Sequence, residues 1–410
     1  MKIISVRAIE ILDSRGNPTI KAFVVLDDGT IGSASVPSGA SRGDYESLEL
    51  RDKNEHYQGQ GVLHAVQNVN SIIANELVGM DINTLEKIDQ HMIDIDGTEN
   101  KTILGANALL SVSLACARAF ALHHKNPLWK ALNDYYFDAE QTRFPRMMVN
   151  IINGGAHADW NTDIQEYMIV PRDRIPTSAI ETSANIFHTL KKTLEDQDLP
   201  AVVGDEGGFV PTLSSNMSGF DLIHGAITQA GYSRNEIDIA TDIAASEFYR
   251  DGTYHFEGRT LSSSDLSNYY SSLIQQYNIF SFEDPFDQDD WYAFSQFTRD
   301  YGQTHMIVGD DLFVTHPTRI KKGIHEHAAN AVLIKLNQVG SLLETVQAIT
   351  ATRKAGWKVI ISHRSGETED SFISDLAVAC GADFMKAGSM SRSERMVKYN
   401  RLLEIEKVEY

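Results

Sequence analysis

Cysteine is scarce in this chain, since its 410 residues include two, Cys116 and Cys380. Both lie in runs of small residues that are typical of helices, SLACARAFA and DLAVACGAD, and neither has the spacing of a metal-binding motif. This scarcity excludes a disulfide framework and indicates reduced thiols in a protein core. We therefore predict a cytoplasmic protein; a secondary cell-surface location is not readable from the sequence.

Positive charge and long apolar runs are also in short supply. Lys and Arg number 36 against 56 Asp and Glu, which gives a formal net charge of −20. Such a charge repels phosphate backbones and anionic lipid, so we expect no nucleic-acid partner. The longest apolar stretch, ALLSVSLACARAFAL, is interrupted by Arg118, and the N-terminus reaches acidic and turn residues too early for a signal peptide. We expect no membrane insertion.

The chain is long enough for two domains, and its pattern changes accordingly. Residues 1–60 contain short β-rich segments between turn signals such as DSRGNP, and residues 61–125 have helical periodicity. These features predict an N-terminal α+β capping domain over residues 1–137. From 138 to 410, apolar strands alternate with helices over the length of an α/β barrel. We predict a modified eight-stranded TIM-like barrel there.

Apolar strands of the second part end in ionisable residues, at intervals close to the roughly 30 residues of one strand-helix unit. These residues are Asp242, Glu283, Asp310, Lys335, His363 and Lys386. A single charged strand end is better explained by solvent exposure. Six at barrel spacing instead favour a shared site, because the C-terminal ends of parallel strands converge on one mouth, where barrel enzymes hold their chemistry.

The residue types at these strand ends suggest a reaction. Three carboxylates without cysteine partners favour a hard cation, Mg²⁺ ahead of Mn²⁺ or Ca²⁺, and the cationic residues beside them favour an anionic substrate. Lys335, in the run AVLIKLNQVG, could extend from its strand end to water. Alternatively it serves as a base, for which its pKa must fall; a nearby metal and Lys386 would both lower it. Metal, carboxylates and lysine together suggest proton abstraction next to a carboxylate group.

Long motifs along essentially the whole chain resemble the enolase family. They include ILDSRGNPT, VPSGAS, NIINGGAHAD, DIQEYMIV, VGDEGGF, EDPFDQDDW, VGDDLFVT, LIKLNQVGSLLET, ISHRSGETED and GSMSRSER. The resemblance implies a hydro-lyase of the phosphopyruvate hydratase type. Its expected reaction is the reversible dehydration of 2-phosphoglycerate to phosphoenolpyruvate in glycolysis and gluconeogenesis, and its expected small-molecule partner is a phosphorylated carboxylate.

The resemblance also implies metal and catalytic residues. The expected metal ligands are Asp242, Glu283 and Asp310, joined by Ser41 for a second Mg²⁺ when substrate is bound. In this family pattern Lys335 abstracts the α-proton, Mg²⁺ stabilises the enolate, and Glu206 assists loss of hydroxide. The other residues implied in catalysis or substrate binding are Glu166, His157, His363, Gln165, Arg364, Ser365 and Lys386. Read alone, Glu206 would belong to an acidic turn, His157 would be a loop or core histidine, and Ser41 would be an ordinary turn serine.

Three positions depart from the usual pattern of the family. Arg42 follows PSGAS where Thr is usual. Because it lies beside the loop that closes over the substrate, the resemblance implies the chemistry but not the rate of loop closure. Lys21 and Glu404 stand where the family has Glu and Arg, and the resemblance implies that this pair meets across a dimer interface. We therefore predict a homodimer, or a higher oligomer of dimers, in which the two charges of the pair are exchanged. Two alternatives remain open: an enolase-like paralogue acting on a phosphonate analogue, and a non-catalytic surface or structural role.

Overall fold

The computed structural model describes residues 1–39, 43–137, 142–158 and 160–409. Its first three strands form an antiparallel sheet in the order β1 (Ile3–Leu12), β2 (Pro18–Leu26) and β3 (Ile31–Ser35). The turn between β1 and β2 is closed by Asp13, whose Oδ1 accepts hydrogen bonds from the backbone N–H groups of Arg15 (2.8 Å) and Asn17 (2.9 Å). Gly16 takes a φ of +77°, which favours glycine. The small antiparallel sheet predicted from the turn signals is confirmed.

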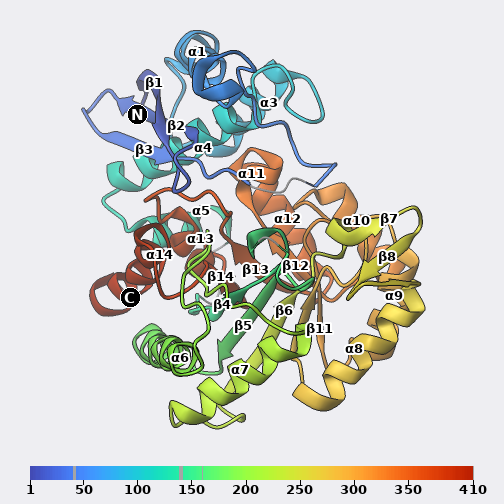
Figure 1. Cartoon of the computed structure of the whole chain (residues 1–410). Coiled ribbons are helices and arrows are strands. Elements are labelled where there is room, and N and C mark those ends of the chain that lie inside the picture. The colour runs from blue at the N-terminus through green and yellow to red at the C-terminus, as the bar shows by residue number, and fades with distance from the viewer. Residues whose placement is uncertain (40–42, 138–141, 159, 410) are drawn as a thin grey trace.

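Helices pack on this sheet and complete the N-terminal part. One helical segment runs through α1 (Leu63–Asn68), the π-helix η2 (Val69–Ile73) and α2 (Ala74–Leu77), after the 3₁₀ helix η1 (His56–Gly59). The later helices are α3 (Leu85–Asp96), α4 (Ala106–His123) and α5 (Leu128–Tyr136). Figure 1 shows these blue and cyan elements together on one side of the barrel.

Helix α4 has the length and composition of a membrane span, but it is the core helix of this part. Of its span, 78% is buried inside the protein. It packs closely on β3, because a Cβ at Gly32 would run into the backbone of Ala115 and Ala119. Cys116 lies in α4, Cys380 directly follows α13 (Phe372–Ala379), and both are free and buried, as the sequence predicts.

Eight strands close into the predicted barrel. In spatial order they are β4 (Arg146–Asn153), β5 (Glu166–Pro171), β6 (Ile237–Asp242), β10 (Ser281–Glu283), β11 (Met306–Gly309), β12 (Ala331–Ile334), β13 (Lys358–Ser362) and β14 (Phe384–Lys386). The expectation that all of them run parallel is wrong at β5, which is antiparallel to both neighbours. The described residues of the connection from β4 to β5 contain the 3₁₀ helix η3 (Gly155–Ala158) and no α-helix, whereas parallel neighbours need a crossover that is usually an α-helix.

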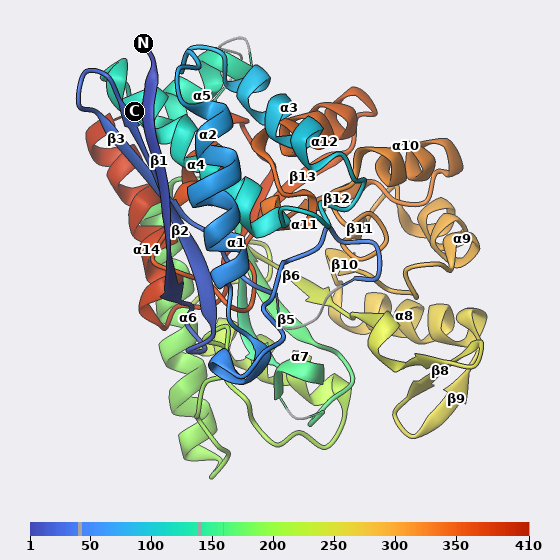
Figure 2. The same cartoon turned by 90° about the horizontal axis from the view of Figure 1, so that it is seen from above.

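Helices surround the barrel, as Figures 1 and 2 show. Besides α13, they are α6 (Pro176–Asp196), α7 (Asn216–Gln229), α8 (Ser263–Tyr277), α9 (Trp291–Tyr301), α10 (Pro317–Glu326), α11 (Leu336–Val339), α12 (Leu342–Lys354) and α14 (Ser393–Glu404). Smaller elements are η4 (Ala245–Phe248), a sheet of β7 (Tyr249–Arg250), β8 (Thr253–Phe256) and β9 (Arg259–Leu261), and η5 (Ile405–Glu409). The predicted division at residues 137 and 138 stays a prediction, since 138–141 lie outside the described residues.

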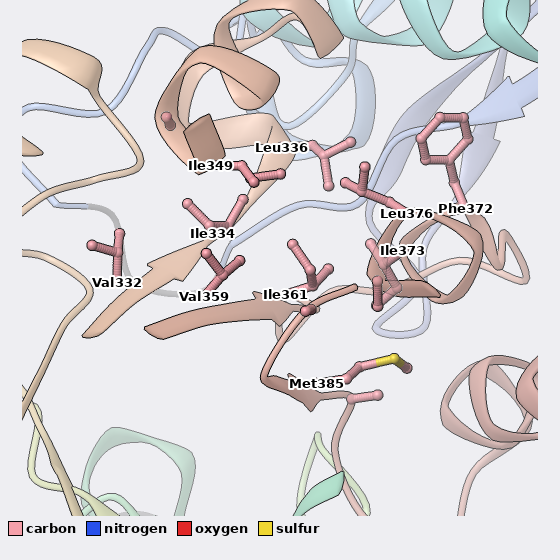
Figure 3. Packing of buried hydrophobic residues seen from close by; sticks show 14 of the residues in the cluster. Val332, Ile334, Leu336, Ile349, Val359, Ile361, Phe372, Ile373, Leu376 and Met385 are labelled. Carbon is pink, nitrogen blue, oxygen red and sulfur yellow. The ribbon is translucent and has the colours of Figure 1, made fainter. Parts of the chain in front are cut away.

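Barrel strands alternate between two apolar clusters, which explains their nearly continuous hydrophobic character. Residues 332 and 334 of β12 and 359 and 361 of β13 pack outward against α12 and α13 (Figure 3). Their neighbours Leu333 and Ile360 belong to a second cluster, with members from seven of the barrel strands, that fills the interior. Both faces of these strands are therefore buried, and polar side chains gather at the strand ends.

The N-terminal helices dock on the start of α12 through buried polar groups. Asp89 of α3, which is 2% exposed, accepts hydrogen bonds from Leu343 N and Ser113 Oγ, both at 2.9 Å. Lys101 forms an ion pair with Glu344 at 2.8 Å. Burial raises the pKa of Asp89 to about 7, although these hydrogen bonds lower it in part. The carboxyl group therefore keeps its proton up to about pH 7 at this contact.

Stability is expected to respond to this carboxyl group between about pH 4 and pH 7. Below the ordinary aspartate pKa of 3.8 both folded and unfolded chains hold the proton; as pH rises toward 7 the folded chain alone keeps it, and stability falls. Each pKa unit corresponds to about 1.4 kcal/mol, so the loss is up to about 4 kcal/mol. Asp89→Asn should remove this pH dependence in chemical denaturation, and Asp94→Asn, at an exposed site of the same helix, should retain it. Equal pH profiles for the wild type and Asp89→Asn would contradict the assignment.

Candidate active site

The ionisable strand-end residues meet at one mouth of the barrel. Three of them are the last residues of their strands and three directly follow a strand. The first group is Asp242 of β6, Glu283 of β10 and Lys386 of β14, and the second is Asp310 after β11, Lys335 after β12 and His363 after β13. All six strands are parallel, so these residues share one end of the barrel.

The reversed strand β5 adds residues to the same mouth from its opposite end. Glu166 is the first residue of β5, and the antiparallel register places it beside Asp242. Gln165, one residue earlier, donates its backbone N–H to Asp242 O at 3.1 Å. A parallel β5 would have carried both residues to the far end of the barrel.

A single cavity at this mouth collects ten of the thirteen residues implied in the site. Those ten are Gln165, Glu166, Glu206, Asp242, Asp310, Lys335, His363, Arg364, Ser365 and Lys386. Glu283 is fully buried and contacts Lys386. His157 lies in η3, with its side chain outside the described part, and Ser41 and Arg42 lie outside the described residues altogether.

Lys386 lies among three carboxylates. Its Nζ is 2.8 Å from Glu283 Oε1 and 3.1 Å from both Asp242 Oδ2 and Glu166 Oε2. Burial lowers the pKa of Lys386, but these carboxylates raise it by more than burial lowers it. The pKa of Lys386 is therefore well above its usual value. Burial, with neighbouring carboxylates, also raises the pKa values of Glu166 and Glu283. A permanent ammonium charge therefore offsets the mutual repulsion of the acids.

Lys335 forms an ion pair with Asp310 and does not extend to water, since its side chain is 16% exposed. Burial lowers the pKa of Lys335, but the Asp310 carboxylate raises it more, and the net direction is upward. Lys386 lowers the pKa of Lys335, as the sequence reasoning expects, but the effect of Asp310 outweighs it. The sequence did not indicate that Lys335 and Asp310 would be in direct contact.

Arg364 is held by Glu46, a residue that the sequence patterns did not single out. Two guanidinium nitrogens of Arg364 donate to the Glu46 carboxylate at 2.8 and 3.2 Å, and both side chains are buried. Gln338 links this pair to the metal-ligand candidates, since its Nε2 lies 3.3 Å from Glu46 Oε1 and 3.1 Å from Asp310 Oδ1. The segment after residue 42 therefore closes one side of the mouth.

His363 is oriented by Arg395, a second residue that the sequence reasoning missed, although it ends the quoted motif GSMSRSER. Arg395 is fully buried, and its Nη1 donates to His363 Nδ1 at 2.6 Å. A guanidinium can only donate, so Nδ1 accepts and a neutral His363 carries its proton on Nε2. Nε2 lies 3.6 Å from Glu206 Oε2. Burial lowers the pKa of His363 well below its usual value, which favours this neutral form.

A second group of acids lies at the same mouth. Carboxylate oxygens of Asp284, Asp310 and Asp311 all lie within 4.8 Å of one another. Burial and the neighbouring Asp310 raise the pKa of Asp311 to about 8. This all-oxygen donor set fits a hard divalent cation. This group shares Asp310 with the predicted ligands, whereas the other two, Asp242 and Glu283, contact Lys386. The sequence reasoning missed Asp284 and Asp311, although each is next to a predicted ligand in the chain.

Comparison with known families gives two matches that together span nearly the whole chain. Residues 3–132 match the model "Enolase, N-terminal domain", and residues 141–409 match the model "Enolase, C-terminal TIM barrel domain".

Proposed function

This chain belongs to the enolase family, and from that premise we propose how its residues divide the dehydration of 2-phosphoglycerate. The chain is a phosphopyruvate hydratase, a glycolytic lyase that interconverts 2-phosphoglycerate and phosphoenolpyruvate. The observation that carries this conclusion is the match of both enolase domains. The clustering of base, acid and cationic residues in one cavity supports the division of roles.

In the proposed division, Lys335 Nζ takes the α-proton of the substrate and Glu206 gives a proton to the departing hydroxyl. Glu206 is positioned by the amide of Asn150, which donates to its Oε2 at 3.1 Å, and it faces the Nε2 side of His363. The two groups approach the cavity from different elements, since Lys335 follows β12 and Glu206 lies between α6 and α7. Such separation allows the proton to be removed and delivered on different sides of the substrate.

The cationic residues hold the anionic ends of the substrate in this proposal. Arg364 and Ser365 bind the phosphate, and Lys386 faces the carboxylate, with Gln165, Glu166 and His157 as further contacts. Arg364 is buried, and the nearby Glu46 carboxylate raises its pKa although burial lowers it. The guanidinium therefore stays charged, and a guanidinium forms strong charge-assisted hydrogen bonds with phosphate oxygens.

The family implies Mg²⁺, and the acids at the mouth fit it. We propose Asp242, Glu283 and Asp310 as ligands, Ser41 as a ligand of a second Mg²⁺ with substrate, and Asp284 and Asp311 as adjoining acids that the structure adds. When bound, Mg²⁺ supplies positive charge for the substrate carboxylate as the proton leaves. Drawing Asp310 toward a cation would also weaken its hold on Lys335, whose neutral form is the base.

The activity test follows phosphoenolpyruvate absorbance from 2-phosphoglycerate with purified protein. We expect turnover with Mg²⁺ and none in a chelator. Turnover of a phosphonate analogue together with inactivity toward 2-phosphoglycerate would instead identify the paralogue.

We further propose a cytoplasmic homodimer in which Lys21 meets Glu404 of the partner subunit. Lys21 projects from β2 with its Nζ 5.6 Å from the centroid of the Phe23 ring. Glu404 ends α14, is 62% exposed, and contacts Arg401 of its own chain at 3.0 Å. Glu404 is therefore exposed at the surface, and Lys21 is half-buried, which is compatible with a contact to a partner.

Lys21→Glu is expected to weaken the dimer, because two acids would then face each other. The cost is about 0–1 kcal/mol if the pair is exposed at the rim and about 2–5 kcal/mol if it is desolvated. Sedimentation should show partial dissociation of Lys21→Glu and recovery in the double variant with Glu404→Arg. Lys191→Glu is the matched control, since this lysine is 51% exposed on α6. A double variant no tighter than Lys21→Glu would rule out the pair.

A further inference from the structure

Three potential metal ligands converge in the N-terminal part, away from the barrel mouth, and a fourth contacts one of them. The three are Glu10 of β1, Asp52 of the segment between β3 and η1, and His56 at the start of η1, and the fourth is His64 of α1. One ligand atom each of Glu10, Asp52 and His56 lie within 4.8 Å of one another. In both views α1 lies beside β1, so residues far apart in sequence meet here (Figures 1 and 2).

Each acid of this cluster is paired with an imidazole. His56 Nε2 lies 2.8 Å from Glu10 Oε2, and His64 Nδ1 lies 3.4 Å from Asp52 Oδ1. Arg51, the chain neighbour of Asp52, directs its guanidinium to Glu49, to Ser38 Oγ and to the carbonyls of Pro18 and Gln60. Each of the two carboxylates therefore faces an imidazole nitrogen, which can bind a metal in its neutral form.

Backbone hydrogen bonds hold the two carboxylates in place. Asp52 accepts from Leu63 N and His64 N, both at 2.9 Å, and Glu10 Oε1 accepts from Val62 N at 2.8 Å. These donors form the first turn of α1, so the acids are aimed before any cation arrives. Each carboxylate oxygen keeps a further lone pair.

The loop approaches the cluster closely at Gly61. A Cβ on Gly61 would lie 2.5 Å from both Asp52 Oδ2 and His56 Cδ2, so a larger residue would push the acid and the imidazole apart. Gly61 has no positive φ, and its requirement here is one of space. The close approach of Asp52 and His56 therefore depends on this glycine.

Burial in the cluster is graded from the acids to the imidazoles. The Asp52 and Glu10 side chains are 1% and 14% exposed, whereas those of His56 and His64 are 37% and 60% exposed. The inner acids are held by backbone hydrogen bonds, and the outer rings are open to solvent, from which a cation would enter.

We propose that Glu10, Asp52, His56 and His64 form a second metal site, for a divalent first-row transition cation. Glu10, Asp52 and His56 supply three grouped ligand atoms, and His64, which contacts Asp52, would supply the fourth. A set of two imidazole nitrogens and two carboxylate oxygens suits Zn²⁺, whereas the all-oxygen acids of the barrel mouth suit Mg²⁺. Metal would replace the direct His56–Glu10 hydrogen bond and join β1, the loop before α1 and α1 itself. This inference does not depend on the proposed catalytic roles.

Cobalt binding tests the site, because tetrahedral Co²⁺ stands in for Zn²⁺ and absorbs visible light. Full-length protein stripped with chelator and returned to excess Mg²⁺ is titrated with Co²⁺ by absorbance and calorimetry. We expect His56→Gln to bind one equivalent fewer than the wild type. His91→Gln is the matched control, since His91 is exposed in the same part of the chain and pairs with one carboxylate, Glu76, at 3.2 Å.

The difference in stoichiometry separates this site from the barrel mouth, where any Co²⁺ that displaces Mg²⁺ would be counted equally in all variants. Glu10→Gln should also lose one equivalent, and it decides the case if His56→Gln fails to fold. Equal stoichiometry in the wild type and the folded variants, or no Co²⁺ bound by the wild type, would overturn the proposal.

Discussion

Lys335→Ala is expected to abolish exchange of the α-proton of 2-phosphoglycerate with solvent deuterium, whereas Glu206→Gln retains exchange and loses net dehydration. Lys335 is the proposed base and Glu206 the proposed acid, so each variant removes one proton transfer. General acid or base catalysis contributes about 10²–10⁴-fold, and turnover should fall by that order in both variants. Exchange is measured by NMR of recovered substrate.

The matched control for Lys335 is Lys358→Ala, because Lys358 starts β13 at the opposite end of the barrel and is 54% exposed. This variant should keep both exchange and turnover. If Lys335→Ala and Glu206→Gln lost exchange alike, or kept it alike, the assignment of base and acid would be wrong.

Chelation is expected to abolish activity, with the best recovery in Mg²⁺, and Asp310→Asn should lower it by about 10²-fold or more. A catalytic metal is worth several kcal/mol, and each 1.4 kcal/mol is tenfold in rate. Asp310 also contacts Lys335, so the loss of rate alone would not separate its two roles. Calorimetric titration with Mg²⁺ supplies the second readout, and the variant should bind Mg²⁺ more weakly.

Asp300→Asn, which removes a carboxylate 54% exposed near the end of α9, is the control for charge. It should leave both Mg²⁺ affinity and activity unchanged. Full activity in chelator, or wild-type Mg²⁺ affinity in Asp310→Asn, would contradict the metal assignment.

The local pattern of the sequence was sufficient to predict the barrel, because the spacing of apolar residues agrees with their burial along each strand. Segments such as AVLI are buried on both faces, and the first polar residue after them marks the strand end. The same reasoning identified six residues of the mouth, since parallel strands in a closed barrel end at one edge. The motifs identified the family, which the family models confirm. The individual roles of the site residues stay predictions.

The direction of β5 was decided by the tertiary structure. A strand has the same apolar pattern in either direction, so its sequence does not distinguish parallel from antiparallel pairing. The reversal brings Glu166 to the mouth from the start of its strand and pairs it with Asp242. Pairing of this kind depends on the connection and on both neighbours at once.

The sequence by itself determined which chemical groups this protein carries and which strand ends would present them. Only the tertiary structure decided their partners: Lys386 among three acids, Lys335 against Asp310, and Glu46 and Arg395 behind Arg364 and His363. Glu46 and Arg364 are 318 residues apart in the chain. Local periodicity carries no information about such contacts, because they join segments that meet only in the closed barrel with the N-terminal segment over its mouth. In these contacts the charge of each partner shifts the pKa of the other.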